Sequence, residues 1–181
     1  MTKHFLAITE SVPHLNHGGG GITAYTAINS FVQRGHRVSL LSLNKSDDPV
    51  PGKIETHFIS KDLNLKDQVT QIIEKLNPDA LFMYHWNSIA AAKGIHIKPK
   101  LGIVGDPIHL THLERREFDQ RTRYNNSKEF FFLKTKHWFK NNVIEKVKIA
   151  RIKKHMHKLL LDCDASGAFA AHHADEFHRN G

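Results

Sequence analysis

Cysteine is almost absent from the sequence: Cys163 is the only one, so no disulfide can form within the chain. Disulfide-rich small-domain folds are therefore excluded, and a single thiol is compatible with a reducing compartment. Long apolar runs are absent as well. No stretch approaches the roughly 20 apolar residues of a membrane-spanning helix, and the apolar run after Met1 is too short for a secretory signal. We expect a cytoplasmic protein.

Repeats and low-complexity stretches are also missing, which excludes solenoid, collagen-like and largely disordered chains. The hydrophobic content of 40% and the charged content of 24% are ordinary for a globular domain. A chain of 181 residues suits a single domain. We therefore expect residues 1–181 to form one domain.

The basic character of the chain is confined to one segment. Lys128–Lys158 contains ten lysines and arginines against two glutamates, which accounts for the whole net charge of +8. Its aromatic residues, among them Phe130 and Trp138, are interleaved with lysines. This mixture is typical of a membrane interface, although single-stranded nucleic acid and a helix packed on the domain with its lysines outward are alternatives. We expect 128–158 to meet an anionic membrane at its inner face rather than nucleic acid.

Strand and helix patterns alternate along the first 106 residues, which predicts an α/β fold with a mostly parallel sheet of about six or seven strands in a Rossmann-like three-layer domain. After residue 109 the alternation stops. Residues 109–127 look irregular, a helical segment covers about 128–161, and a last strand and helix start follow at 165–170 and 172–180. The earlier expected strands are 5–9, 37–43, 54–59, 80–84 and 101–104, and the expected helices are 22–34, 65–76 and 88–93.

Four consecutive glycines, Gly18, Gly19, Gly20 and Gly21, lie between the first expected strand and the first expected helix. Glycines let the backbone approach a ligand closely, and the free N–H groups of a helix N-terminus attract an anion. We expect this glycine loop to bind a phosphate or diphosphate. A flexible turn without a ligand is the alternative.

Two nucleotide-binding patterns compete at this loop. The spacing of Gly19, Gly21 and Ala24 satisfies the dinucleotide fingerprint literally. However, about eight residues separate the strand from the glycines, where that fingerprint requires a tight turn, and Asn44 replaces the acidic residue expected after the second strand. An NAD- or FAD-binding oxidoreductase module is therefore the weaker alternative.

The order of motifs resembles the N-terminal domain of the large family-4 group of retaining GT-B glycosyltransferases. That domain opens with a strand, a proline-containing loop, a glycine loop, a helix and a Gly-His before the second strand; here these are Pro13, the four glycines and Gly35-His36. Asn77-Pro78-Asp79 and the strand ending at His85 resemble a later segment of the family. The similarity covers residues 5–106 and, more loosely, 162–181.

The resemblance implies transfer of a sugar from a nucleotide sugar, with retention, to a glycan, lipid-linked or small-molecule acceptor, without a tightly bound cofactor. Asp106 corresponds to the aspartate of a His-Asp pair after the fifth strand, so we expect it to be catalytic. Gly105 stands where the family often has the histidine, and no histidine role carries over there. His85 and His109 are expected to bind substrate together with the glycine loop.

In this family a second domain holds the nucleotide sugar and carries a pair of glutamates, and nothing in the sequence corresponds to it. We expect the donor-binding domain to be absent from this chain and the chain alone to be inactive. The rival classes are the oxidoreductase module and a non-catalytic basic adaptor for a membrane or nucleic acid.

Metal-binding patterns are present but weak. Asp162-Cys163-Asp164 matches the Asp-x-Asp motif of another glycosyltransferase fold, and we interpret it as a loop of solvated carboxylates. The fifteen histidines include close pairs, but no cysteine pair supports a zinc site. We expect no metal.

Overall fold

The computed structural model describes residues 1–16, 18–46, 54–105, 108–119, 139, 143–168 and 174–175. The chain divides into two compact units. The first contains Met1–Gly105 and Leu159–Ala170, and the second contains Asp106–Lys158 and Ala171–Gly181. The first unit contains the sheet and most of the residues expected to form a site.

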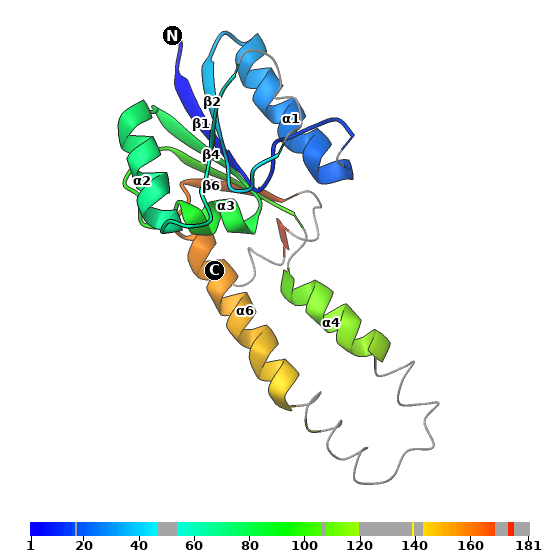
Figure 1. Cartoon of the computed structure of the whole chain (residues 1–181). Helices are drawn as coiled ribbons and strands as arrows, with labels where there is room; N and C mark the ends of the chain where they lie inside the picture. Colours follow the sequence, from blue (N-terminus) through cyan, green and yellow to red (C-terminus); the bar gives the residue numbers. More distant parts are fainter. Residues whose placement is uncertain are drawn as a thin grey trace. The chain divides into compact units, whose positions relative to one another are not determined.

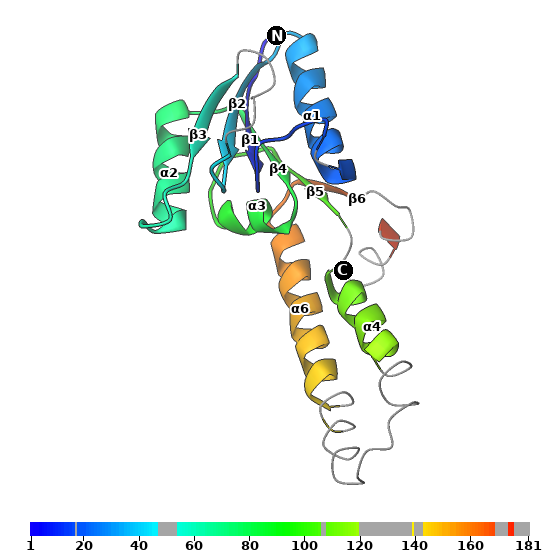
Figure 2. The same cartoon turned by 45° about the vertical axis from the view of Figure 1, so that its right-hand side comes forward.

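The first unit is built on a six-stranded sheet in which every pair of neighbouring strands is parallel (Figures 1 and 2). The strand order is β3-β2-β1-β4-β5-β6. The expected α/β, Rossmann-like three-layer fold is therefore confirmed. The strands are β1 His4–Thr9, β2 Arg37–Ser42, β3 Glu55–Phe58, β4 Ala80–Tyr84, β5 Lys100–Val104 and β6 Ala165–Ala168.

Burial on both faces explains why β4 is apolar throughout. All five residues of β4 are buried, as expected for a strand covered by helices on both sides. Leu81 and Met83 are almost completely inaccessible, and burying each such side chain contributes about 1.5–3 kcal/mol. Ala7, Leu40 and Phe82 lie in the core against helix α1, Gly18–Gln33. The other helices that cover the sheet are α2, Leu65–Leu76, and α3, Trp86–Ala91.

Local capping fixes α2 at both ends. The side chain of Asn64 accepts hydrogen bonds from the backbone N–H groups of Lys66 and Asp67, which satisfies two of the free donors at the helix start. Asn77 ends the helix in the left-handed conformation, with φ of 43°. Asparagine tolerates this conformation better than most residues, and the following proline cannot continue the helix. The expected bounds of 65–76 are confirmed.

Two expectations about helices are wrong. The four glycines were expected to form a loop before a helix at 22–34, but α1 already begins at Gly18, so they form its first turn. Glycine is a poor helix former, and packing of the apolar face of α1, including Ala24 and Ile28, overrides that preference. Residues 109–127 were expected to be irregular, yet Ile108–Asp119 forms helix α4. Its apolar residues are few and unevenly spaced, so the helical period was missed.

The second unit contains most of helix α6, Glu145–Leu160. This helix lies within the helical segment expected at 128–161; residues 120–138 and 140–142 of that region lie outside the described residues. The four side chains expected to face outward are all exposed, namely Lys148, Arg151, Lys154 and Lys158. Ile149, Met156 and Leu159 are buried. The amphipathic interpretation of α6 is therefore confirmed.

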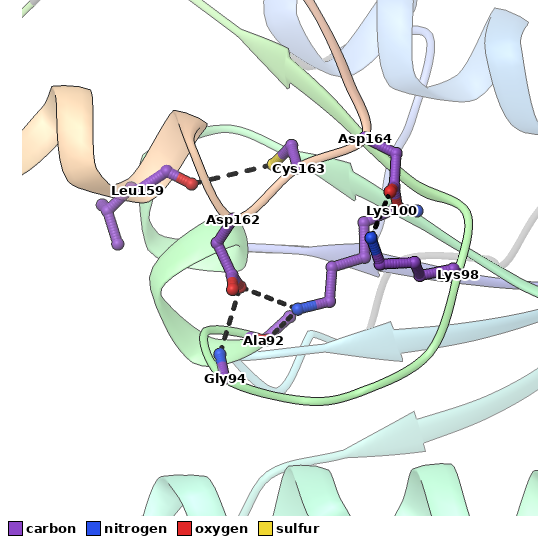
Figure 3. A network of polar contacts seen from close by, with 8 residues as sticks. All are labelled: Ala92, Gly94, Lys98, Lys100, Leu159, Asp162, Cys163 and Asp164. Carbon is purple, nitrogen blue, oxygen red and sulfur yellow. Dashed lines mark hydrogen bonds and ion pairs between the residues drawn. The ribbon is translucent and has the colours of Figure 1, made fainter.

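After α6 the chain returns to the sheet, where it is held by a network of polar contacts (Figure 3). The buried ammonium of Lys100 lies 2.7 Å from Oδ2 of Asp162, which also accepts a hydrogen bond of 3.1 Å from the Gly94 N–H. Asp164 accepts a hydrogen bond of 2.8 Å from the Lys100 N–H and lies 3.0 Å from the Lys98 ammonium. We call these contacts the Lys100 clamp.

The Lys100 clamp corrects the interpretation of Asp162-Cys163-Asp164 as a loop of solvated carboxylates. Both carboxylates are engaged in fixing the start of β5 to the start of β6. Burial raises the pKa of the Cys163 thiol to about 11, so the thiol stays protonated near neutral pH. Of the last expected helix, 172–180, only residues 174–175 belong to the described part, and both are helical.

Candidate functional site

A pocket opens at the point where the strand order of the sheet reverses. β1 lies between β2 and β4, so the chain runs outward in one direction from β1 and in the other from β4. In open α/β sheets, ligands bind in the crevice outside the carboxyl ends of the strands at this reversal. The pocket has a volume of about 170 Å³ and is lined by Thr9, Glu10, Ser11, Pro13, Gly20, Gly21, Ala24, Tyr84 and His85. We call it the reversal pocket.

One wall of the reversal pocket is the first turn of α1. Gly20 and Gly21 line the pocket, and the first turn of a helix offers backbone N–H groups without partners inside the helix. A Cβ at Gly20 would lie 3.4 Å from the hydroxyl oxygen of Tyr84. A Cβ at Gly18 or Gly19 would meet no atom within 4 Å. Gly20 therefore allows a close approach to Tyr84, whereas Gly18 and Gly19 leave open space.

His85 also lines the reversal pocket and follows β4 directly. Its backbone has φ of 77° and ψ of 162°, a region that is essentially restricted to glycine and costs other residues on the order of 1–3 kcal/mol. The His85 N–H donates a 2.8 Å hydrogen bond to the carbonyl of Ile103. Nδ1 of the imidazole lies 2.9 Å from Oε1 of Glu10. Strained backbone conformations of this kind cluster at ligand-binding and active sites, which makes His85 a candidate site residue.

Glu10 is a site residue that the sequence did not single out. It follows β1 directly, and its Oε1 accepts hydrogen bonds from His85 Nδ1 and, at 2.6 Å, from Asn87 Nδ2. The only feature of the sequence that could have pointed to Glu10 is its position. Like His85, it occupies the carboxyl end of a buried strand. The sequence separation of 75 residues hides their pairing.

Glu10 also lines a second pocket of about 290 Å³ beyond the ends of β2 and β3. The other lining residues are Leu43, Asn44, Ile59, Ser60, Lys61, Leu63, Leu65 and Asn87. Asn44, expected to disfavour a dinucleotide, donates a hydrogen bond to the Glu10 carbonyl. We call this second pocket the outer pocket. Glu10 lines both the outer pocket and the reversal pocket.

Tyr84 closes the reversal pocket beneath the glycine turn. Burial raises the pKa of its hydroxyl, and a hydrogen bond with Thr23 offsets part of that rise. The phenol therefore stays neutral near neutral pH and keeps its proton for hydrogen bonding.

The other expected site residues fall at the border of the described structure. Asp106 lies outside the described residues. The strand that ends before Asp106 is the neighbour of the strand that ends before His85, because β4 pairs with β5. His109 lies in the first turn of α4, in the second unit, and its side chain is outside the described part. Their roles stay predictions.

Within 1–16, 18–46, 54–105, 108–119, 139, 143–168 and 174–175, no three histidine, cysteine or acidic side chains lie close enough together to hold a metal ion.

Replacing Gly18 and Gly19 singly by alanine should change stability in opposite directions. Gly18 has φ of +62°, so Gly18→Ala should lower the free energy of unfolding by about 1–2 kcal/mol. Gly19 has an ordinary helical φ and open space around its Cβ position, so Gly19→Ala should raise it by about 0.5–1 kcal/mol. Urea unfolding followed by circular dichroism measures both. Equal effects would contradict the assignment of the glycines to the first turn of α1.

The strain at His85 predicts that glycine is the better residue for stability at this position. His85→Gly and His85→Ala both lose the Glu10 hydrogen bond, but only glycine relieves the backbone conformation. We expect the glycine variant to be more stable than the alanine variant by about 1–3 kcal/mol. Thermal and urea unfolding of the pair measure this difference. An alanine variant as stable as the glycine variant would show that the backbone relaxes without strain.

No family model matches the chain, and no curated protein matches it. Function must therefore be inferred from the pocket and from the motifs that line it.

Proposed function

We propose that this chain is the acceptor-side domain of a GT-B-type glycosyltransferase resembling the retaining family-4 enzymes. The observation that carries the proposal is the reversal pocket, which is lined both by the start of α1 and by the Glu10–His85 pair. The N–H groups at the start of α1 suit an anion, and the Glu10–His85 pair suits neutral polar groups. A nucleotide sugar combines these two chemistries, because its diphosphate is anionic and its sugar is rich in hydroxyl groups.

Each wall has a distinct role in this proposal. The N–H groups of the first turn of α1 and its positive dipole end stabilise the diphosphate of the donor. The imidazole of His85 contacts a sugar hydroxyl. Asp106 follows β5, the neighbour of β4, and takes the catalytic position on the acceptor side. In the enzymes that the sequence resembles, a second α/β domain binds the nucleotide and closes on such a cleft.

An oxidoreductase module is the second candidate, and the strand order favours it. The order β3-β2-β1-β4-β5-β6 is that of dinucleotide-binding folds. However, eight residues lie between the end of β1 and the start of α1, and Asn44 occupies the place of the acid that binds the ribose. Isothermal titration calorimetry with NADH, NADPH and nucleotide sugars separates the candidates. Tight binding of a nicotinamide cofactor alone would favour the oxidoreductase.

The glycosyltransferase proposal predicts that the 181-residue chain has no transferase activity by itself. The reason is that donor binding and the catalytic cleft require the second domain. Release of nucleoside diphosphate from UDP-, GDP- and ADP-sugars, with simple glycosides as acceptors, measures turnover. Turnover well above the buffer background would contradict the proposal that activity requires a second, donor-binding domain.

We also propose that the second unit contacts an anionic membrane through α6. Helical spacing places Ile144, Val147, Lys148, Arg151 and Lys158 along one stripe. Ile144 and Val147 are 51% and 47% exposed, and the three basic residues are exposed as well. Exposed apolar side chains beside cations suit the boundary between acyl chains and anionic headgroups. Among the described residues, no helix is long and apolar enough to cross a membrane.

A further inference from the structure

The hydrogen-bonding roles of the groups around Glu10 follow from the chemistry of a carboxylate. An ionised carboxylate can only accept hydrogen bonds. The 2.9 Å contact therefore requires a proton on Nδ1 of His85, and the 2.6 Å contact requires the amide nitrogen of Asn87 to face Glu10. In the neutral imidazole, Nε2 is then an acceptor, and the amide oxygen of Asn87 is an acceptor too.

We propose that Glu10 is a positioning residue that makes this end of the cleft a binding site for the hydroxyl groups of a polyol. By holding the donors of His85 and Asn87, it leaves their acceptor atoms for a ligand. His85 lines the reversal pocket and Asn87 lines the outer pocket, so the two acceptors serve two adjoining cavities. Identifying the polyol as a sugar rests on the proposed glycosyltransferase function.

Electrostatics select the same class of ligand. Glu10 lines both pockets, and its carboxylate repels a phosphate or carboxylate group placed beside it. Neutral hydroxyl groups donate hydrogen bonds to Nε2 of His85 and to the carboxylate without that repulsion. Among the described residues, no hydrogen bond or ion pair occupies Nε2 of His85. The anionic part of a ligand is therefore directed to the glycine turn and the hydroxyl part to Glu10.

The strain at His85 supports a ligand-binding role for this arrangement. A glycine would adopt the φ of 77° without penalty, so the imidazole is retained at the expense of stability. Its contact with Glu10 fixes the ring at the mouth of the pocket. Both residues are partly exposed, at 39% for His85 and 34% for Glu10, so a ligand can reach them.

The tautomer of His85 is the first test. Long-range ¹⁵N–¹H correlation spectra of the 181-residue chain should show the neutral ring protonated on Nδ1 with Nε2 bare. Glu10→Ala should abolish this preference. Glu55→Gln is the matched control, because Glu55 lies 3.2 Å from Nε2 of His57 on β3, outside both pockets. It should leave the His85 signals unchanged. A ring protonated on Nε2 in the wild-type chain would overturn the proposal.

Ligand class is the second test, with methyl α-glucoside, methyl α-mannoside, myo-inositol and inorganic phosphate as probes. At least one polyol should shift the His85 ring and Asn87 amide signals, and Glu10→Ala should weaken its apparent Kd roughly tenfold or more. Phosphate should shift the Gly19 and Gly20 amide signals and leave His85 unchanged. The Glu55→Gln chain should behave as wild type. Phosphate acting at His85, or none of the three polyols acting there, would overturn the proposal.

The two proposals fail in different ways. A polyol response at His85 together with tight binding of a nicotinamide cofactor would preserve the hydroxyl site and contradict the glycosyltransferase assignment. Binding of a nucleotide sugar that is unaffected by Glu10→Ala would preserve the assignment and contradict the role of Glu10. Backbone amide spectra of each variant report whether the fold is intact.

Discussion

Asp162→Ala should lower the free energy of unfolding by about 3–5 kcal/mol, because it leaves the ammonium of Lys100 buried without its partner. The Lys100 side chain is 4% exposed and lies 2.7 Å from Asp162, and its other contact is a 3.4 Å hydrogen bond to the Ala92 carbonyl. The same change frees the Gly94 N–H. Urea unfolding at neutral pH, followed by circular dichroism, measures the loss.

Lys98→Ala is the matched control for the Lys100 clamp. Lys98 pairs with Asp164 at 3.0 Å, but its side chain is 81% exposed, and exposed ion pairs contribute about 0–1 kcal/mol. The double variant Lys100→Met with Asp162→Leu should recover much of the loss, because an apolar pair removes the buried charge. Losses of similar size for Lys98→Ala and Asp162→Ala would mean that burial of Lys100 is not the cause.

The clamp also gives stability a dependence on acid pH. Burial alone would raise the pKa of Asp162, but hydrogen bonds from Lys100 and Gly94 outweigh it and hold that pKa below 3.8. The hydrogen bond from the Lys100 N–H lowers the pKa of Asp164. Each of these two carboxylates therefore stabilises the fold at pH values above its pKa in the unfolded chain. This stabilisation is lost as pH falls below about 4, through the pKa values of the folded state. The variant with both aspartates replaced by asparagine should lose less stability on acidification.

Charge reversal on α6 should weaken binding to anionic vesicles on the order of 100-fold or more. The change is Arg151, Lys154 and Lys158 to glutamate, all exposed in the structure. Each basic residue near an anionic bilayer contributes about 1 kcal/mol, and three reversals replace attraction with repulsion. Co-sedimentation with phosphatidylserine-containing vesicles measures the partition coefficient, which should also fall as salt screens the charges.

A control with the same change in net charge distinguishes a local surface from general electrostatic attraction. Lys45, Lys66 and Lys75 are exposed in the first unit, and replacing all three by glutamate should change binding much less. Neutral phosphatidylcholine vesicles should bind neither variant nor wild type. Equal loss for the two triple variants would leave only a net-charge effect, and equal negligible binding to both vesicle types would make α6 an ordinary solvated helix.

The sequence predicted the elements whose signals are local. Strand β4 was predicted at its observed bounds because Ala80–Tyr84 is an apolar run between Asp79 and a polar residue. Helix α2 was predicted equally well because Asn77-Pro78 stops its periodic pattern. The start of α1 was misplaced, since four glycines normally indicate a loop and only packing against the sheet makes them helical.

The site was predicted in part, for a related reason. His85, Gly20 and Gly21 line the reversal pocket, and the sequence singled them out because the ends of parallel strands and the start of the following helix meet at one edge of a sheet. Glu10 was missed because its importance depends on two partners more than 70 residues away. Lys100 was missed because one buried lysine in a polar stretch looks like many exposed ones. Long-range pairing of polar residues leaves no periodic trace in a sequence.

The position of β6 at the edge of the sheet has a consequence for synthesis. About 60 residues separate the end of β5 from β6, and at 5–20 residues per second a ribosome needs about 3–12 s to make them. During that time the β5 edge has no strand beside it, and an open edge can pair with another chain. The nascent protein therefore passes through a period of aggregation risk that ends when Ala165–Ala168 joins the sheet. Slow translation of the basic segment would lengthen that period.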